Sequence, residues 1–525
     1  MNNDLIIEKL SLTENDLEQL KAHNVSIDSV AEQLKFFENG IETIELERAC
    51  TINDGIIKLS DAAINNFSQL FENEIAGKTL CKFVPASGAA TRMFKDLLFI
   101  YNNNVNVSEL LNDKTKADTE IAEAVKTFAG LKKFSFYNDL KTAMENDGFD
   151  IENLISLGDY NPILEYLLFD KGLNLSNLPK GLIKFHSYDD KTRTAFEEHL
   201  TEAAVYACNK NKQANVHFTI SPEHFKSISE HINDVLNFYT TDGIEINVEY
   251  STQKNSTDTI ALDKNNKLAR DIDGKILFRP SGHGALLENL NSTDADIIFI
   301  KNIDNVLPDS LKEDTYTFKR VLGGALIDIQ TKTFNYLNKI EEDKIDDKNI
   351  NELINFAEDE LQLYLPEKFF AQDLEYQKKY LFDKLNRPIR ICGMVKNEGE
   401  PGGGPFWVKE QAGRVSKQII EAAQINFESE SQKEIFESST HFNPVDIVCA
   451  VKNYKGIKFN LPDYRNPNLG IMGAKTYNGE SIRVLELPGL WNGGMHNWIT
   501  LFLEVPLTTF NPVKKINDLL KQAHQ

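Results

Sequence analysis

A loop of small residues followed by two cations is the part of the chain best equipped for chemistry. Residues 83–95 read Phe-Val-Pro-Ala-Ser-Gly-Ala-Ala-Thr-Arg-Met-Phe-Lys, a short apolar strand, a loop and the start of a helix. Backbone N–H groups in such a loop approach a phosphate closely, and a helix N-terminus adds a favourable dipole. The alternative is an ordinary strand-turn-helix joint, since the loop is neither a P-loop nor a dinucleotide fingerprint. The predicted nucleotide-binding residues are Ala86, Ser87 and Gly88, and the predicted phosphate-neutralising residues are Arg92 and Lys95.

Two further turns present a candidate functional side chain beside proline or glycine, the residues that most strongly shape the backbone. Lys180 lies between proline and glycine in the sequence Leu178-Pro-Lys-Gly, which can present an ammonium group at a fixed point. His283 lies between two glycines, and Gly282 frees the backbone to follow the edge of a base or a sugar. The alternatives are a solvated loop lysine and a plain surface histidine.

A carboxylate follows the most apolar strand expected in the chain. Residues 296–302 read Asp-Ile-Ile-Phe-Ile-Lys-Asn, typical of a buried parallel strand, and Asp304 follows two residues after Asn302. A carboxylate at the carboxyl edge of a central strand is where Mg²⁺ between nucleotide phosphates is held. The sequence therefore predicts Asp304 as a Mg²⁺ ligand, and the alternative is an Asx turn or a helix cap.

The four segments, in this order, resemble the motifs of the sugar nucleotidyltransferases, most closely the UDP-sugar pyrophosphorylase branch. The loop motif of that family, Pro-Ala-Ala-Gly-x-Gly-Thr-Arg-Met, corresponds to residues 85–93. Its Pro-Lys-Gly-Leu, Pro-x-Gly-His-Gly and Asn-x-Asp-Asn motifs correspond to residues 179–182, 280–284 and 302–305. The pattern is also similar to a bacterial group, the domain of unknown function 4301 family, and we expect the chain to belong there.

This resemblance implies a reaction and a role for each motif residue. An oxygen of a sugar 1-phosphate attacks the α-phosphorus of a nucleoside triphosphate, with UTP favoured, and pyrophosphate leaves. Because the attacking phosphate is already a dianion, catalysis is mostly positioning and charge neutralisation. The resemblance implies that Arg92 and Lys95 hold the β- and γ-phosphates and that Lys180 stabilises the charge around the α-phosphate. It also implies that Asp304 holds Mg²⁺. The residues implied to bind the nucleoside are Gly88, Gln253, Gly282 and His283.

The chain departs from the family pattern at two places. Ala90 replaces the second glycine of the loop motif, so its backbone must avoid positive φ or accept strain. Roughly 80 residues separate the loop from Pro179, where relatives have a short link.

Residues beyond 385 hold further candidates for the sugar or phosphate side of the site. Lys396 ends a predicted strand before a glycine-rich loop, and Asn443 and Asp446 lie in Thr440-His-Phe-Asn-Pro-Val-Asp. Trp491 and Asn492 lie in a segment rich in Trp, Asn and Gly, and Trp faces stack on sugars or bases. The alternatives are a surface loop and core packing.

Composition narrows the classes of partner. The chain has 525 residues, 41% hydrophobic residues and a net charge of −22. This charge repels nucleic acid and anionic membranes, which leaves a small-molecule nucleotide and a sugar phosphate as the predicted partners. Five widely spaced cysteines predict free thiols in a reducing compartment. With no apolar run near the ~20 residues of a membrane helix, we expect a cytoplasmic protein.

The order of predicted elements indicates an α/β protein. We expect strands at 79–84, 214–220, 244–250, 296–302 and 390–396, with helices around 309–339 and 350–384 and a short helix at the end of the chain. Ser60 is the expected N-cap of an earlier helix. Strands interleaved with helices predict a three-layer α/β/α open mixed sheet, similar to nucleotide-diphospho-sugar transferases. We expect an N-terminal helical region over 1–76, a nucleotidyltransferase-like core over 77–345 with a helical insertion at about 99–177, and a C-terminal part over 346–525 that completes the sheet and the sugar side.

Other functions stay open at the level of sequence. A glycosyltransferase that consumes a nucleotide sugar commonly holds its metal through Asp-x-Asp, and Asp294-Ala-Asp296 has that spelling but precedes its strand. A nucleotide-binding regulatory protein that has lost its chemistry would account for Ala90 and the insertion. A metal-dependent hydrolase is disfavoured because the ten histidines show no His-x-x-x-His spacing.

Overall fold

The computed structural model describes residues 3–41, 43–105, 119–240, 242–399, 402–410 and 414–525. The chain divides into two compact units. The first unit comprises Met1–Leu80, Gln253–Ile300 and Phe318–Pro506. The second unit comprises Cys81–Thr252, Lys301–Thr317 and Leu507–Gln525. Each unit is therefore assembled from segments that are far apart in the sequence.

The first unit is built on a mixed sheet with the strand order β2-β3-β18-β12-β15-β11. The bounds are β2 (Thr51–Ile52), β3 (Gly55–Ile57), β18 (Ile499–Glu504), β12 (Ile389–Lys396), β15 (His441–Ala450) and β11 (Ile297–Ile300). Strand β18 is parallel to β3 and β12, whereas β15 is antiparallel to β12 and β11. Every residue of β15 and β11 is buried, and the paired segments 447–450 and 297–300 are apolar throughout, as expected for buried strands. The predicted α/β class with a mixed sheet is confirmed.

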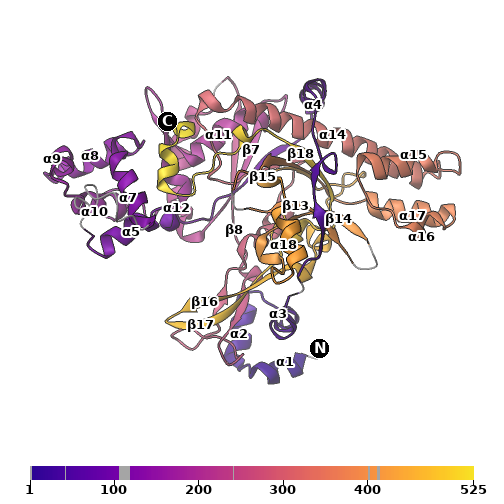
Figure 1. Ribbon diagram of the computed structural model, residues 1–525, viewed down its shortest axis with the longest axis horizontal. Helices are drawn as coiled ribbons and strands as arrows, with labels where there is room; N and C mark the ends of the chain where they lie inside the picture. The colour runs from indigo at the N-terminus through magenta and orange to yellow at the C-terminus, as the bar shows by residue number, and fades with distance from the viewer. Residues whose placement is uncertain (1–2, 42, 106–118, 241, 400–401, 411–413) are drawn as a thin grey trace. The chain divides into compact units, whose positions relative to one another are not determined.

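Two smaller sheets complete the first unit. One has the order β10-β9-β17-β16, with bounds Phe278–Arg279, Thr259–Leu262, Glu480–Glu486 and Ile471–Tyr477. It packs against α1 (Asn3–Leu10), α2 (Glu14–Ala22) and α3 (Ile27–Asn39), whose apolar side chains share one core with it (Figure 1). The other has the order β1-β13-β14, with bounds Leu46–Ala49, Gly404–Lys409 and Val415–Ile420.

The remaining helices of the first unit include two that approach one another closely. Helix α4 (Asp61–Glu74) begins at the predicted N-cap Ser60, whose Oγ accepts a hydrogen bond from the Ala63 N–H group. It contacts the long helix α14 (Glu313–Glu341) at two adjacent glycines. Helices α15 (Ile350–Asn355), α16 (Glu367–Phe370) and α17 (Leu374–Leu385) lie together in Figure 1, and the predicted helical regions 309–339 and 350–384 are confirmed.

The second unit contains three parallel strands in the order β4-β7-β8. Their bounds are Leu80–Pro85, Gln213–Ile220 and Glu245–Thr252, and all three were predicted. Helix α11 (Ala195–Tyr206) precedes β7, and α12 (Phe225–Val235) connects β7 to β8. Because the strands are parallel, their carboxyl ends meet at one edge, where α/β sheets bind ligands.

A buried ion triad fixes one face of β4. The Glu202 carboxylate on α11 accepts hydrogen bonds from Lys82 Nζ (2.8 Å) and Lys301 Nζ (2.8 Å). All three side chains are at least 97% buried. Lys301 opens the segment that leads to Asp304, so α11 holds both β4 and this segment.

The helical insertion is confirmed within the described residues. It consists of α5 (Lys95–Asn102), α7 (Thr119–Ala129), α8 (Tyr137–Asn146), α9 (Ile151–Leu157) and α10 (Asn161–Leu168), which gather together in Figure 1. Part of the predicted insertion, residues 106–118, lies outside the described residues.

Two local predictions differ from the structure. Residues 46–57, expected to be helical, form β1, β2 and β3, because β1 pairs with β13 and β3 pairs with β18 from far along the chain, while β2 pairs with β3. The predicted terminal helix is a pair of 3-10 turns, Ile516–Leu520 and Gln522–His524.

The cysteines and the helices have two further properties. The described part of the chain contains no disulfide, and every cysteine except Cys208 is buried. No helix among the described residues is long and apolar enough to cross a membrane.

The contact between α4 and α14 generates a stability prediction. A Cβ atom at Gly324 would lie 1.9 Å from the backbone oxygen of Phe67, so Gly324→Ala must push the two helices apart. We expect a loss of at least about 2 kcal/mol in the free energy of unfolding, measured by urea denaturation. Gly473→Ala is the control, because no atom lies within 4 Å of its new methyl group, and it should change stability by less than about 0.5 kcal/mol. Equal effects of the two substitutions would contradict this close packing.

Candidate functional site

The phosphate-loop candidate and the predicted lysine turn are hydrogen-bonded to each other in the second unit. The Ala90 N–H group donates to the Leu178 carbonyl (3.1 Å), and the Lys180 N–H group donates to the Gly88 carbonyl (3.1 Å). Thr91 Oγ1 also donates to a carbonyl of the segment that enters the turn (3.2 Å). Two motifs about ninety residues apart in the sequence therefore form one surface at the carboxyl end of β4.

The Lys180 side chain reaches the predicted metal ligand. Lys180 Nζ lies 2.7 Å from Asp304 Oδ2, and the two side chains are 13% and 10% exposed. Lys514 Nζ lies 3.3 Å from the same oxygen. Asp304 Oδ1 is buried, and within the described part of the chain it has no hydrogen-bond partner. Oδ2 of the Asp304 carboxylate is therefore paired with two ammonium groups, whereas Oδ1 is available to a ligand.

Burial and charge oppose each other at this ion pair. Burial raises the pKa of Asp304, but the ammonium groups of Lys180 and Lys514 outweigh it, so the pKa lies below the ordinary value. Burial lowers the pKa of Lys180, and Asp304 only partly restores it. Lys180 is therefore a cation held where little water stabilises it, so an added phosphate would be strongly attracted.

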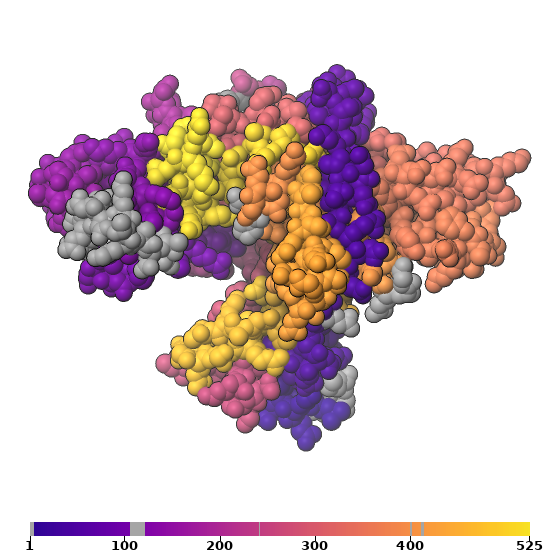
Figure 2. All heavy atoms as spheres, in the orientation of Figure 1, coloured from indigo at the N-terminus to yellow at the C-terminus, as the bar shows by residue number. Residues whose placement is uncertain are grey.

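The C-terminal segment completes this part of the site and was missed by the sequence analysis. The Val513 N–H group donates to the Asp304 carbonyl (3.0 Å), and the Ile516 N–H group donates to the Met93 carbonyl (3.2 Å). These bonds place Lys514 beside the Asp304 carboxylate. The same segment packs against the insertion helices (Figure 2). No local pattern around Lys514 marks it as functional, because its position depends on contacts more than two hundred residues away.

The loop itself is open to solvent where a phosphate would bind. Ser87 and Gly88 are exposed, whereas Ala86 is buried and donates its N–H group to the Thr219 carbonyl (2.8 Å). Arg92 lies in the 3-10 turn Ala90–Arg92 and is exposed. Lys95, also exposed, is the first residue of α5.

Ala90 fits its position in the loop without strain. It is fully buried, begins the 3-10 turn and is not among the residues with positive φ. The departure from the family glycine therefore leaves the loop backbone in an allowed conformation for a residue with a Cβ atom.

In the first unit, His283 is fixed by the loop that carries Trp491. The two rings stack with centroids 4.1 Å apart, and the Leu490 N–H group donates to His283 Nδ1 (3.0 Å). A Cβ atom at Gly489 would lie 2.3 Å from the ring, so only glycine permits this approach. Burial lowers the pKa of His283, although Glu421 and Glu486 oppose the shift. The ring is therefore neutral, with its proton on Nε2.

Gln253 and the glycine before His283 also lie in the first unit. Gln253 Nε2 is buried with no hydrogen-bond partner in the described chain, so it is a donor available to a ligand. Gly282 has φ +71°, the left-handed region that glycine adopts without strain, and a Cβ atom there would lie 2.8 Å from Glu486 Oε2.

Three of the predicted sugar-side residues, Asn443, Asp446 and Asn492, have defined polar partners in the first unit. Lys396 is exposed at the end of β12, and Asn443 Nδ2 donates to the Gly393 carbonyl (2.9 Å). Asp446 forms a buried ion pair with Lys319. Asn492 Nδ2 donates to Gln424 Oε1 (3.2 Å), while its own Oδ1 is buried without a partner among the described residues.

The Asp-x-Asp sequence serves a structural purpose. Asp294 Oδ1 and Asp296 Oδ1 each lie 2.9 Å from Lys452 Nζ, and Asp296 Oδ2 accepts the Thr79 N–H group (2.9 Å). Both carboxylates are thus committed at the start of β11 rather than at its carboxyl end.

The part of the chain that the structure describes contains no group of three His, Cys, Asp or Glu side chains that could hold a metal ion. A Mg²⁺ site of the nucleotide-assisted kind needs only one or two carboxylates, since substrate phosphates and water supply the other ligands. The uncommitted Oδ1 of Asp304 fits this requirement.

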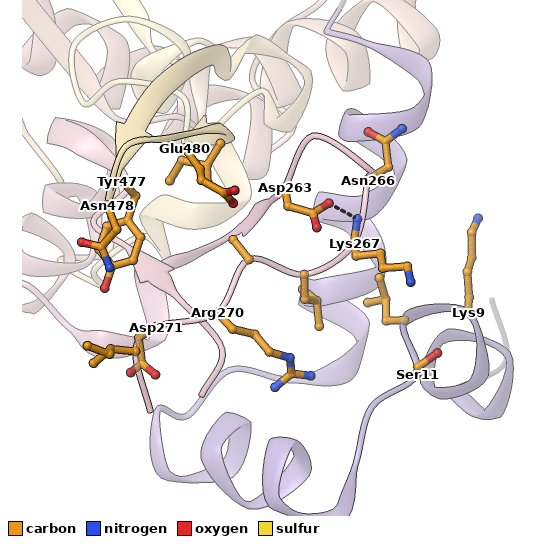
Figure 3. A pocket seen from close by; sticks show the side chains of 15 residues that line it. Lys9, Ser11, Asp263, Asn266, Lys267, Arg270, Asp271, Tyr477, Asn478 and Glu480 are labelled. Carbon is orange, nitrogen blue, oxygen red and sulfur yellow. Dashed lines mark hydrogen bonds between the residues drawn. The ribbon is translucent and has the colours of Figure 1, made fainter. Parts of the chain in front are cut away.

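A separate pocket of about 720 Å³ lies in the first unit and contains none of the predicted site residues (Figure 3). Asp263 and Lys267 share a turn there, where the Lys267 N–H group donates to Asp263 Oδ1 (2.9 Å). Arg270, which also lines it, is held by Asp16 (2.8 Å). Its cations and carboxylates are mixed, which gives it no strong preference for a charged ligand.

Comparison with protein families identifies the family of this chain. The family model described as Domain of unknown function (DUF4301) matches residues 13–525. The chain belongs to this family. The expected membership of the DUF4301 family is thus confirmed over nearly the whole length, and no curated protein matches the chain.

Several solved structures are similar to this chain and distant from it in sequence. The uridine diphosphate N-acetylglucosamine pyrophosphorylase of Trypanosoma brucei has a TM-score of 0.48 and 11% identity, covering 99% of this chain and 81% of its own. The UDP-glucose phosphorylase of Trypanosoma brucei has a TM-score of 0.43 and 12% identity, covering 96% and 77%. The UDP-glucose pyrophosphorylase of Leishmania major has a TM-score of 0.42 and 12% identity, covering 96% and 77%.

The Lys180–Asp304 pair generates a second stability prediction. Asp304→Asn leaves the buried ammonium group of Lys180 without its carboxylate, and we expect a loss of about 3 kcal/mol in the free energy of unfolding at pH 7. Because the folded pKa of Asp304 lies below the ordinary value of 3.8, the difference from wild type should shrink as pH falls below that value. Urea denaturation between pH 7 and pH 3 measures both effects.

The matched control is an exposed ion pair of the same unit. Lys226 and Glu230 are 86% and 63% exposed, so Glu230→Gln should change stability by less than about 0.5 kcal/mol. A loss in Asp304→Asn no larger than this control would show that the pair is not buried in solution.

Proposed function

We propose that this DUF4301 protein catalyses Mg²⁺-dependent transfer of a nucleotidyl group from a nucleoside triphosphate, with UTP favoured, to a sugar 1-phosphate. The observation that carries the proposal is the 2.7 Å ion pair between Lys180 and Asp304 beside the small-residue loop. Three of the four motifs meet there within one compact unit, at the carboxyl ends of parallel strands.

In the proposed reaction, an oxygen of the sugar 1-phosphate forms a bond to the α-phosphorus as the bond to the pyrophosphate oxygen breaks. The electron pair of that bond leaves with pyrophosphate, and the attacking dianion needs no proton removed. The protein must therefore align two anions and offset their charge. Cations around an exposed loop, in a chain of net charge −22, supply that local offset.

Each cation has a proposed position along the triphosphate. Arg92 and Lys95, on the exposed side of the loop, bind the β- and γ-phosphates. Lys180, desolvated and within reach of Asp304, stabilises the charge that develops at the α-phosphate. The exposed loop N–H groups at Ser87 and Gly88 bind phosphate oxygens.

Mg²⁺ would be held by Asp304 and would supply further charge neutralisation at the phosphates. Gln253, Gly282 and His283 stay the predicted ligands of the nucleoside. The neutral His283 ring offers an N–H donor rather than a base, which agrees with a reaction that needs no general base. Lys396, Asn443, Asp446, Trp491 and Asn492 stay predictions for the sugar side.

The decisive experiment incubates the full chain with Mg²⁺, UTP and a panel of sugar 1-phosphates and measures pyrophosphate release. We expect pyrophosphate and a nucleotide sugar in equal amounts for at least one sugar. Lys180→Ala should lower kcat by at least about 100-fold, since it removes a charge that acts on the transition state. Lys226→Ala, an exposed lysine of the same unit, should leave kcat unchanged.

Other outcomes assign the rival functions. Release of a nucleoside diphosphate from a nucleotide sugar would identify a glycosyltransferase. Calorimetric binding of UTP without turnover, with any triphosphate tried, would identify a nucleotide-binding regulatory protein and overturn the proposal.

A further inference from the structure

A small pocket in the first unit has walls that are unusually rich in positive charge. It lies where the end of α17, strand β14 and the segment before β18 meet, and its volume is about 90 Å³. That is the space of roughly three water molecules at ~30 Å³ each. The residues that carry its charge and polarity are Lys384, Arg387, Arg414, Lys417, Gln418 and His496, and we refer to it as the cationic pocket.

The charges of the cationic pocket are not balanced by the protein. Glu410 is the single carboxylate residue among those that line it. This carboxylate is already committed, because Oε1 lies 3.3 Å from His496 Nε2 and Oε2 lies 3.7 Å from Arg414 Nε. The pocket therefore keeps an excess of positive charge in a chain whose net charge is −22.

Three of the cations have no carboxylate partner in the described part of the chain. Lys417 Nζ donates to the Gln362 side-chain oxygen (2.6 Å), and Arg387 Nε donates to the Asp383 carbonyl (2.9 Å). Lys384 Nζ lies over the Tyr380 ring, 5.6 Å from its centroid. None of these contacts neutralises a charge.

Other buried lysines of the protein are neutralised. Lys312 pairs with Glu198 (2.5 Å), and Lys319 pairs with Asp446. Burying a cation without a counter-ion is unfavourable, so an uncompensated group of cations indicates a ligand that carries the missing charge. Two ring nitrogens of the wall, Trp498 Nε1 and His496 Nδ1, are also buried without a hydrogen-bond partner among the described residues.

The acid-base properties of the lysines agree with this imbalance. Burial, with help from Arg387 and Arg414, lowers the pKa of Lys384 to about 8. Burial lowers the pKa of Lys417 to about 7. An anion in the pocket would oppose both shifts.

We propose that the cationic pocket binds a phosphate-sized oxyanion, either inorganic phosphate or the phosphoryl group of a small metabolite. The site is separate from the proposed nucleotidyl transfer, because none of the residues predicted for that reaction lines it. Two larger pockets, of about 890 and 390 Å³, share Glu410 and Arg414 with it, so the remainder of a phosphorylated metabolite has space beside it.

Sulfate is the first probe, because it keeps its charge between pH 6 and pH 9. Isothermal titration calorimetry of the full chain at pH 6.5 should show saturable binding. Arg387→Gln should lower the affinity for sulfate at least about tenfold, which is the effect of losing one charge-assisted hydrogen bond. Lys384→Gln, a second half-buried cation of the wall, should do the same, and circular dichroism verifies that each variant is folded.

The control variant is Lys264→Ala, because this lysine of the same unit is 69% exposed and does not line the cationic pocket. It should bind sulfate as wild type does. No binding of sulfate or phosphate to wild type, or equal affinity in all folded variants, overturns the proposal.

The pH dependence gives an independent readout. As pH rises from 6 to 9, Lys417 and then Lys384 lose their protons in the empty pocket, so sulfate affinity should fall and binding should take up protons. The groups facing Lys384 are Arg387, Arg414 and Glu410, and those facing Lys417 are Cys50 and Cys392. Burial raises the thiol pKa values to about 12 and about 11, so the thiols stay neutral in this range. An affinity independent of pH contradicts binding at these lysines.

Inorganic phosphate and glucose 6-phosphate, titrated at pH 6.5, distinguish the two sources of the oxyanion. Tighter binding of the ester assigns the pocket to a phosphorylated metabolite, and binding of phosphate alone assigns it to the free ion. Both results support an oxyanion site, and failure of both probes to bind overturns it.

Discussion

The buried carboxylate of Glu202 is the constraint on which the second unit depends. It accepts hydrogen bonds from Lys82 on β4 and from Lys301. Burial raises the pKa of Glu202, but the two lysines together hold it well below its usual range, so the carboxylate is ionised. Removing any one of the three charges would leave the others buried without compensation. The triad therefore forms as a whole, and it fixes β4 and the segment after Lys301 to the same helix.

The functional consequence comes from where the two lysines lie in the sequence. Lys82 precedes the end of β4 by three residues, and Lys301 precedes Asp304 by three residues. Helix α11 makes a second contact with the same segment, because His199 Nε2 donates to the Ile303 carbonyl (3.2 Å). The small-residue loop and the carboxylate are thus anchored through the same helix, and Lys180, which is hydrogen-bonded to that loop, reaches Asp304 from it.

Local sequence patterns predicted the elements that are long and apolar. Strands β4, β7, β8 and β12 were predicted from runs of apolar residues, and the loop after β4 was recognised from small residues followed by cations. Lys180 and Asp304 could be singled out because proline, glycine and asparagine mark their turns. These signals are local, and the structure places the loop after β4, Lys180 and Asp304 in one unit.

Features that depend on distant partners were beyond such patterns. Strands β1, β2 and β3 have two to four residues each, too few to show alternation; β1 pairs with β13, β3 pairs with β18, and β2 pairs with β3. Lys514 reaches Asp304 across 210 positions of sequence. The cationic pocket likewise draws Lys384 from α17 and Lys417 from β14, so only the folded chain reveals that these two ammonium groups have no carboxylate partner among the described residues.

The position of Lys514 also has a consequence for the order in which the protein can mature. Synthesis proceeds from the N-terminus, and domains generally fold as units while the chain is still being made. The second unit is an exception, since Leu507–Gln525 belong to it but are translated after the whole of Phe318–Pro506. During that interval Asp304 has Lys180 but lacks Lys514 and the backbone donor of Val513. The nascent chain therefore carries the surface around Lys180 and Asp304 in an incomplete form until the segment after Pro506 has been synthesised.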